Sequence, residues 1–408
     1  MASATGDASS APRTSIITVA LCYMVAVFEG IDLQAAGVAA PRLGPAFGMT
    51  PEQLGWFFSS STFGLMLGAA IGGRLSDRFG RKAVLICAVG VFGALSLLTA
   101  LAPNVEGLLI ARFLTGVGLG GALPNLVALV AENTAPSQKN RSVGLLYAGL
   151  PTGGAVVSLI SLAGGAEDWR MVFIVGGLAP LIAIPLLMWI LPDSRSQAAV
   201  RQEVERKQGF VQALFRENRA LRSVLLWISF FLSLLTMYLL LNWLPTLLIG
   251  RGLSRPEASL VQVSFNVLGA MASFATGYAM DKWSLPRVIV VCFVASALAL
   301  ALLAGAPAEL AISMAVGGLV GIAMSGTQAL LYAIAPANYP TEVRGTGVGS
   351  AVAIGRLGSA VGPLLAGVLL GSGGSPAEVL GVLIPIILVA GAAALVLSLL
   401  KKGATASS

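Results

Sequence analysis

The stretch "GGRLSDRFGRK" (Gly72–Lys82) places one acid, Asp77, among four basic residues directly after a long apolar run. A second stretch, "GYAMDKWSLPR" (Gly277–Arg287), follows another apolar run in the second half of the chain. It again puts an aspartate, Asp281, beside a basic residue. The same polar pattern at corresponding places indicates an internal repeat that divides the chain into two related halves.

The composition around these stretches is that of a membrane protein. The chain has 408 residues, of which 56% are hydrophobic and 11% are charged, and its mean hydropathy is +0.88. Soluble domains carry about 25% charged residues. The deficit extends along the whole length, so a single buried core does not explain it. The 49 glycines suit close packing of helices in lipid.

The apolar runs predict twelve membrane-spanning helices, because a helix needs about 20 apolar residues to cross the bilayer. The expected spans are roughly 16–38, 54–73, 83–102, 107–131, 142–164, 170–191, 223–249, 257–280, 288–305, 310–333, 346–370 and 377–400. The sequence therefore predicts an all-α protein with two six-helix halves, 16–191 and 223–400. A central loop, 192–222, joins them, and 1–15 and 401–408 are expected to be tails.

Basic residues are divided unevenly between the two sides of this arrangement. Nineteen lie on the side with both termini and four on the other side, Arg42, Arg170, Arg251 and Arg255. This bias predicts cytoplasmic termini in a bacterial inner membrane, and it accounts for the net charge of +7 without nucleic acid. A cleavable signal peptide is the alternative for the first span, but its two acids and the eleven later spans argue against it.

The two acids of the first span are Glu29 and Asp32 in "FEGIDLQAAG", and both lie near its middle. An ionised acid there costs about 2.5 kcal/mol or more. Residues three apart share a helix face, and two neighbouring carboxylates favour protonation of one of them. Because the chain has no histidine, these carboxylates are the candidates for proton coupling. The alternative is a structural ion pair or a packing contact.

A small anionic substrate would find its counter-ion in Arg356, which lies within the eleventh span between two glycines. A guanidinium offers a planar pair of donors that matches a carboxylate. The alternative is a permanent pair with Asp32 or Glu29, and both arrangements could alternate. Candidates to line a small-molecule site, or else to form interhelical hydrogen bonds, are Tyr238, Asn242, Trp243, Asn125, Tyr147, Asn266 and Gln328.

"GRLSDRFGRK" (Gly73–Lys82) fits the signature of the loop between helices two and three of the major facilitator superfamily. "ARFLTGVGLGG" (Ala111–Gly121), "GLPTGG" and "YPTEVRGTGVG" are similar to further motifs of that superfamily. Within it, "EGID" (Glu29–Asp32) resembles the Asp-Gly-x-Asp signature of the aromatic acid:proton symporter family. The glutamate at its first position departs from that signature and fits the branch of hydroxyphenylpropionate transporters.

This resemblance implies the major facilitator fold and import of phenylpropanoid acids. It also implies that the helix 2–3 loop is a conformational latch on the cytoplasmic side. The alternative is that the charges of this loop only set the orientation of the protein in the membrane. The latch set consists of Gly73, Asp77, Arg78, Gly80, Arg81, Lys82, Arg112 and Glu132. Arg112 could instead make a helix–helix bond, and Glu132 could be a solvated helix end.

The sequence is thus interpreted as a proton-coupled importer of small aromatic carboxylates, working by alternating access as a monomer. A proton-coupled exporter of organic anions or drugs is the main alternative, since one fold serves both directions. A membrane receptor without flux is a third. Enzyme activity, a cofactor and a metal site are not expected, because no phosphate-binding loop, nucleophile motif or ligand cluster occurs.

Overall fold

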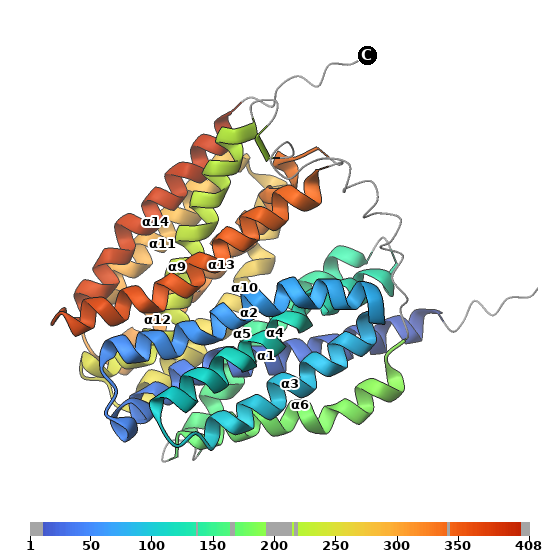
Figure 1. Ribbon diagram of the computed structural model, residues 1–408. Coiled ribbons are helices and arrows are strands. Elements are labelled where there is room, and N and C mark those ends of the chain that lie inside the picture. The colour runs from blue at the N-terminus through green and yellow to red at the C-terminus, as the bar shows by residue number, and fades with distance from the viewer. Residues whose placement is uncertain are drawn as a thin grey trace, which may run out of the picture.

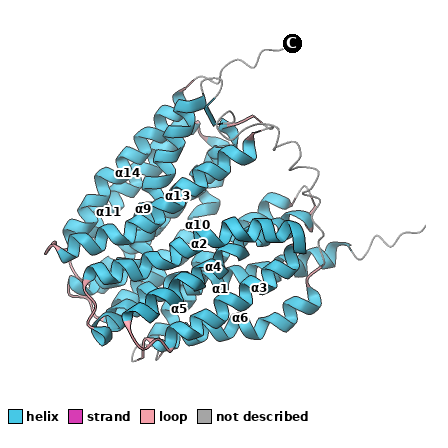
Figure 2. Cartoon of the chain, viewed as in Figure 1, coloured by secondary structure: helices cyan, strands magenta, loops and turns pink. Residues whose placement is uncertain are grey.

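The computed structural model describes residues 11–135, 138–163, 168–192, 214–215, 219–340 and 343–400. These residues form long helices and, within the described ranges, no strands (Figures 1 and 2). The helices are α1 (Ala11–Phe47), α2 (Pro51–Phe79), α3 (Arg81–Ala100), α4 (Val105–Glu132), α5 (Lys139–Leu162), α6 (Arg170–Ile190), α9 (Arg219–Gly250), α10 (Arg255–Lys282), α11 (Leu285–Gly305), α12 (Leu310–Ile334), α13 (Arg344–Gly371) and α14 (Pro376–Leu399), with a short 3-10 helix η1 (Ala335–Asn338).

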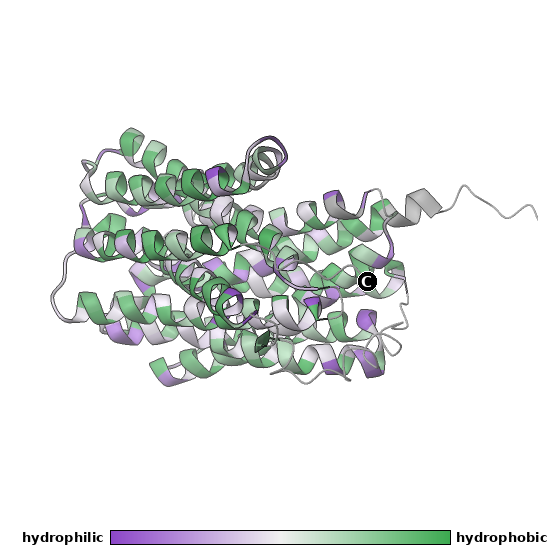
Figure 3. Cartoon of the chain, turned by 90° about the horizontal axis from the view of Figure 1, so that it is seen from above, coloured by the Kyte–Doolittle hydropathy of each residue, from purple (hydrophilic) through white to green (hydrophobic). Residues whose placement is uncertain are grey.

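Twelve of these helices are long and apolar enough to cross a membrane, as the sequence predicted. Hydrophobic residues cover most of their length, and hydrophilic residues gather mainly toward their ends (Figure 3). Helix α1 extends beyond its expected span in both directions, from Ala11 to Phe47, and continues through Pro41 and Pro45. Most of the predicted central loop 192–222, residues 1–10 of the predicted N-terminal tail and the whole predicted C-terminal tail 401–408 lie outside the described residues.

Local sequence explains where several helices begin and end. Three of them, α2, α10 and α14, start with a capping box in which a Thr or Ser accepts a hydrogen bond from the third helical residue. Between α2 and α3 a single residue, Gly80, makes the turn with φ +86°. A residue with a Cβ rarely adopts that conformation, so the glycine of the Gly73–Lys82 stretch is required by the turn.

The two halves repeat the same packing pattern. In the first half α1 packs on α5, α2 on α4 and α3 on α6. In the second half the equivalent pairs are α9 with α13, α10 with α12 and α11 with α14. The internal repeat seen in two short sequence stretches is therefore a repeat of three helix pairs, which supports the two-half architecture.

Glycines allow the closest of these pairs to touch through their backbones. A Cβ at Gly30 in α1 would lie 2.1 Å from the carbonyl oxygen of Leu150 in α5. In the equivalent pair of the second half, a Cβ at Gly358 in α13 would lie 2.0 Å from the carbonyl oxygen of Phe231 in α9. Both glycines lie close in sequence to candidate functional residues, so tight packing holds those residues in place.

The halves meet at one end of the molecule and diverge at the other (Figure 1). At the end where they meet, the Ser59 hydroxyl in α2 donates to the carbonyl oxygen of Ala360 in α13 at 2.6 Å. The neighbouring Phe58 ring packs on Trp243 of α9 with centroids 5.1 Å apart. The diverging end is the one where α1 begins and α14 ends, so the space between the halves opens toward the chain ends.

Candidate functional site

A cavity of about 480 Å³ lies between the two halves. It extends from the middle of α1 toward the last turns of α4 and the first turns of α13, which belong to the diverging end. Its walls are mostly aliphatic, and its charged or aromatic residues come from four helices: Glu29, Tyr147, Tyr332 and Arg356. A largely apolar cavity with a few polar groups is the usual form of a small-molecule site.

One acid and one arginine from opposite halves face this cavity. Glu29 of α1 is only 2% exposed, and its Oε1 atom has no hydrogen-bond partner among the described residues. Arg356 of α13 donates from Nη1 to the hydroxyl of Tyr238, and its guanidinium lies 5.7 Å from the centre of that ring. The sequence placed both residues at the candidate site, and the structure brings them to one cavity.

Two tyrosines from opposite halves add an aromatic wall. The rings of Tyr147 in α5 and Tyr332 in α12 stack with centroids 6.1 Å apart. Phe230 packs edge-on against Tyr332 at 5.3 Å. Sequence reasoning named Tyr147 but missed Tyr332, although its position one helical turn after Gln328 put it on the face of a residue already considered.

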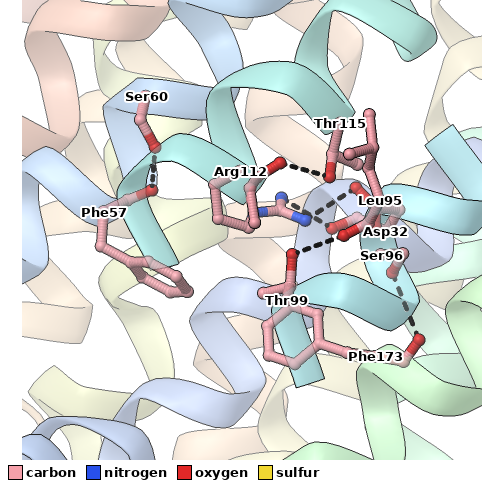
Figure 4. Close-up of polar contacts among 10 residues, drawn as sticks. Asp32, Phe57, Ser60, Leu95, Ser96, Thr99, Arg112, Thr115 and Phe173 are labelled. Atoms are coloured by element: carbon pink, nitrogen blue, oxygen red, sulfur yellow. Dashed lines mark hydrogen bonds and ion pairs between the residues drawn. The ribbon is translucent and has the colours of Figure 1, made fainter. Parts of the chain in front are cut away.

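Asp32 is held in a different environment from Glu29. Its Oδ2 atom accepts a hydrogen bond from Arg112 Nη1 at 2.9 Å, and its backbone carbonyl oxygen accepts another from Nη2 at 3.2 Å. Figure 4 shows the Arg112 side chain directed at Asp32. The two side chains are 0% and 1% exposed, and the guanidinium lies over Phe173 at 5.6 Å. The pair of Asp32 with Arg356 considered from the sequence is replaced by this one, because α4 brings Arg112 level with Asp32.

The remaining polar candidates are not among the described residues that line the cavity. The Asn125 side chain donates to the carbonyl oxygen of Gly121, and Asn242 donates to that of Tyr238, both at 2.8 Å. Trp243 donates to the carbonyl oxygen of Pro363 at 2.9 Å. For these three residues the interhelical or local hydrogen bond is what the structure displays. The side-chain amide atoms of Gln328 are buried without a hydrogen-bond partner in the described part of the chain.

Asn266 belongs to a buried amide network that joins the two halves. Gln34 of α1 donates to Asn266 Oδ1 at 3.0 Å and accepts hydrogen bonds from Gln262 and Asn266 of α10, both at 2.9 Å. Sequence reasoning did not single out Gln34, although a glutamine five residues after Glu29 within an apolar span was a visible signal. The network joins α1 of the first half to α10 of the second half through hydrogen bonds.

The predicted latch residues of the helix 2–3 loop lie at the diverging end. Arg81 Nη1 and Glu132 Oε1 are 2.8 Å apart, and both belong to the first half. Arg78 lies over the neighbouring Phe79 ring at 5.2 Å. The contact between Arg81 and Glu132 therefore links α3 to α4 within one half, and contacts of the loop across the halves stay a prediction for the closed state of this end.

Comparisons with known proteins agree with the architecture. The sequence matches the Major Facilitator Superfamily over residues 22–261 and 226–407. It is 42% identical to the 3-(3-hydroxy-phenyl)propionate transporter of Escherichia coli, covering 95% of each chain. It is 32% identical to the gallate transporter of Pseudomonas putida, covering 88% of this chain and 86% of that one.

Solved structures show the same fold at low sequence identity. A bacterial homologue of the human lysosomal transporter Spinster, in an inward-facing and unoccupied conformation, superposes with a TM-score of 0.75 at 18% identity, covering 96% of this chain and 98% of that one. A D-xylose-proton symporter superposes with a TM-score of 0.73 at 19% identity, covering 91% and 96%.

Proposed function

This chain belongs to the Major Facilitator Superfamily, and we propose that it imports small aromatic carboxylates together with protons across a bacterial inner membrane. The relatives at 42% and 32% identity are named for transport of aromatic acids, and they match this chain along most of its length. The observation that carries the proposal is the cavity, in which one arginine and one acid from opposite halves face an otherwise apolar and aromatic space.

Arg356 is proposed to bind the substrate carboxylate. It is the one arginine among the described residues that line the cavity. A guanidinium forms charge-assisted, bidentate hydrogen bonds with a carboxylate, while tyrosine rings and aliphatic side chains pack against an aromatic ring. Tyr238 keeps the guanidinium in position by accepting its hydrogen bond. Tyr147 and Tyr332 would separate or turn to admit the ring, since they stack on each other in this conformation.

Glu29 is proposed as the principal proton carrier. It faces the cavity and has an unpartnered carboxylate oxygen among the described residues, so it can exchange a proton with water or substrate in that space. When Glu29 is neutral, the substrate carboxylate is the anion that pairs with the Arg356 guanidinium. An ionised Glu29 competes with the substrate for that guanidinium. Asp32 would act indirectly, because its carboxylate is already paired with Arg112 inside the first half.

These roles give an alternating-access cycle. In the conformation open to the face opposite the chain ends, Glu29 takes a proton and Arg356 binds the substrate carboxylate. The halves then rock to the conformation described here, which is open toward the chain ends. Substrate and proton leave, and the ionised Glu29 can neutralise Arg356 during the return.

The test is uptake by purified protein in liposomes with an imposed inward proton gradient. We expect accumulation of labelled 3-(3-hydroxyphenyl)propionate, with gallate and 4-hydroxybenzoate as comparison substrates. Arg356→Ala should abolish uptake, and Arg356→Lys should recover only part of it because an ammonium lacks the bidentate geometry. Glu29→Gln should abolish gradient-driven accumulation but retain exchange of internal for external substrate.

Glu106→Gln is the matched control, because Glu106 is an exposed acid at the start of α4 outside the cavity. It should transport like the unsubstituted protein. A folded protein that accumulates none of the three acids would refute the proposal. Transport that requires an outward proton gradient would instead identify an exporter, and unchanged accumulation by Glu29→Gln would move proton coupling to Asp32.

A further inference from the structure

One buried amide in the second half has no hydrogen-bond partner at either end. Gln328 lies in α12, and both its Nε2 and its Oε1 atoms are buried without a partner in the described part of the chain. No other asparagine or glutamine among the described residues is in this state, since Gln262 lacks a partner only at Oε1. A buried amide that pairs with nothing costs free energy, so its presence needs a reason.

A structural role would leave this amide paired, as it leaves the other amides of the spans. Asn125 and Asn242 each donate to a carbonyl oxygen one turn earlier in their own helix, at 2.8 Å. Asn266 exchanges hydrogen bonds with Gln34 across the two halves. Gln328 does neither, so its amide keeps a free donor and a free acceptor for a ligand.

The position of Gln328 in α12 places it directly behind the cavity wall. Tyr332, which lines the cavity, follows four residues later, so the two lie on one helix face about 6 Å apart along the axis. Because α13 begins at the diverging end, α12 runs toward that end, and Gln328 lies one turn deeper than Tyr332. Side chains on a helix lean toward its N-terminus, so Tyr332 covers the turn that holds Gln328.

This cover is movable because it depends on a contact between the halves. Tyr332 of the second half stacks on Tyr147 of the first half, with ring centroids 6.1 Å apart. An aromatic ring that enters the cavity has to separate this stack, as the proposed function requires. A turn of Tyr332 away from Tyr147 then uncovers the Gln328 amide at the depth where the ring would lie.

The turn with Gln328 is connected to the turn with Arg356 through one phenylalanine. Phe230 of α9 packs edge-on against Tyr332 at 5.3 Å. A Cβ at Gly355, next to Arg356 in α13, would lie 3.2 Å from Cβ of the same Phe230. Arg356 and Gln328 therefore lie on helices of the same half, with Phe230 between their turns. A ligand whose carboxylate pairs with Arg356 would extend its ring toward Gln328.

We propose that Gln328 binds a hydroxyl group on the ring of the aromatic carboxylate and makes transport selective for hydroxylated rings. This inference rests on the proposed import of aromatic carboxylates and names the part of the substrate that the second half recognises. A phenolic hydroxyl can donate to Oε1 or accept from Nε2. An unsubstituted ring leaves the amide unpaired in the bound state, so the site discriminates against it.

The test compares 3-(3-hydroxyphenyl)propionate with 3-phenylpropionate, which has the same carboxylate and side chain but no ring hydroxyl. In proteoliposomes with an inward proton gradient, the unsubstituted protein should show a KM about two- to tenfold lower for the hydroxylated acid, the ratio expected for one neutral hydrogen bond. Gln328→Met keeps the length of the side chain and removes both polar atoms. It should raise the KM for the hydroxylated acid to that for 3-phenylpropionate, with the KM for 3-phenylpropionate unchanged.

Melting temperature separates ligand recognition from a structural role. Gln328→Met removes an unpaired buried amide, so it should melt in detergent at the same temperature as the unsubstituted protein or higher. Thr327→Val is the matched control, since the Thr327 hydroxyl is already paired, with the Ser296 hydroxyl at 3.1 Å and the carbonyl oxygen of Cys292 at 3.4 Å. It should melt at a lower temperature and keep the KM ratio of the two acids.

Three results would overturn the inference. They are equal KM values for the two acids in the unsubstituted protein, an unchanged KM ratio in Gln328→Met, and loss of the ratio in Thr327→Val as well. Gln328→Leu gives the same comparison if Gln328→Met does not fold. Accumulation of both acids with an unchanged ratio would remove this inference alone, whereas accumulation of neither acid by the unsubstituted protein would overturn the proposed function with it.

Discussion

Glu29 and Asp32 are three residues apart on one helix, yet the neighbouring helices give them different surroundings. Asp32 is fully buried against Arg112, with an N–O distance of 2.9 Å. Glu29 faces the cavity shared with Arg356. A buried carboxylate in a salt bridge stabilises the fold only while its partner is present, whereas a carboxylate at a cavity can gain and lose a proton. The difference predicts that the two acids respond differently to substitution.

The Asp32–Arg112 pair should be mainly structural. Arg112→Gln or Asp32→Asn alone leaves one buried charge without its partner, so each should lower the free energy of unfolding by about 3–5 kcal/mol. The double variant should be less destabilised than the sum of the two, because neither charge remains. Thermal unfolding of the purified proteins in detergent measures this double-mutant cycle, and additive losses would show that the pair is not coupled.

At the scale of helices, the glycine next to Glu29 determines how firmly the site is held. Gly30 lets the backbone of α1 touch that of α5, and Gly358 does the same for α13 and α9 two residues after Arg356. The two candidate functional residues therefore lie on helices that are each locked to a partner within their own half. Each half can then move as a rigid unit while the cavity between them changes shape.

Gly30→Ala and Gly358→Ala should each destabilise the protein by about 1–3 kcal/mol or more, because the new methyl group meets a backbone carbonyl that cannot move aside. Gly277→Ala is the control, since a Cβ there meets no atom within 4 Å. It should have a melting temperature equal to or slightly above that of the parent. Melting curves in detergent provide the comparison, and equal stability of all three variants would refute the close-packing argument.

At the scale of the whole molecule, the halves are in contact at one end and separated at the other (Figure 1). The Glu52 side chain at the start of α2 lies over Gly371 at the end of α13, at the end where the halves meet. Together with the Gln34 network between α1 and α10, these contacts close the face opposite the chain ends. Transport by alternating access requires that they open in every cycle.

A disulfide across this contact should stop transport. The pair Glu52→Cys and Gly371→Cys, in a chain whose native Cys22, Cys87 and Cys292 are replaced by serine, should lose uptake on oxidation and recover it with a reducing agent. Each single-cysteine variant should keep its uptake under the same oxidant. Continued uptake by protein shown to be cross-linked would mean that this face does not open during transport.

The charge balance of the cycle gives a second prediction at this scale. One proton and one monovalent carboxylate carry no net charge, so uptake should follow the pH gradient, at about 1.4 kcal/mol per unit, and ignore membrane potential. Proteoliposomes with potassium gradients and valinomycin allow the potential to be set independently of pH. Uptake that rises steeply with an inside-negative potential would require more than one proton per substrate.

The sequence by itself determined the membrane class, the twelve helices, the two halves and the family. Those features follow from local composition, the apolar length of each span and short motifs, all of which are carried by neighbouring residues. The sequence also named Glu29, Asp32 and Arg356, because ionisable residues within an apolar span are rare and conspicuous.

Only the tertiary structure decided which of these residues meet. The pairing of Asp32 with Arg112, the stacking of Tyr147 on Tyr332 and the network around Gln34 each join helices that are far apart in the chain. The depth and rotation of one helix against another depend on packing along its whole length. The spacing of residues within a single helix does not determine that packing. These contacts could therefore not be predicted from the sequence.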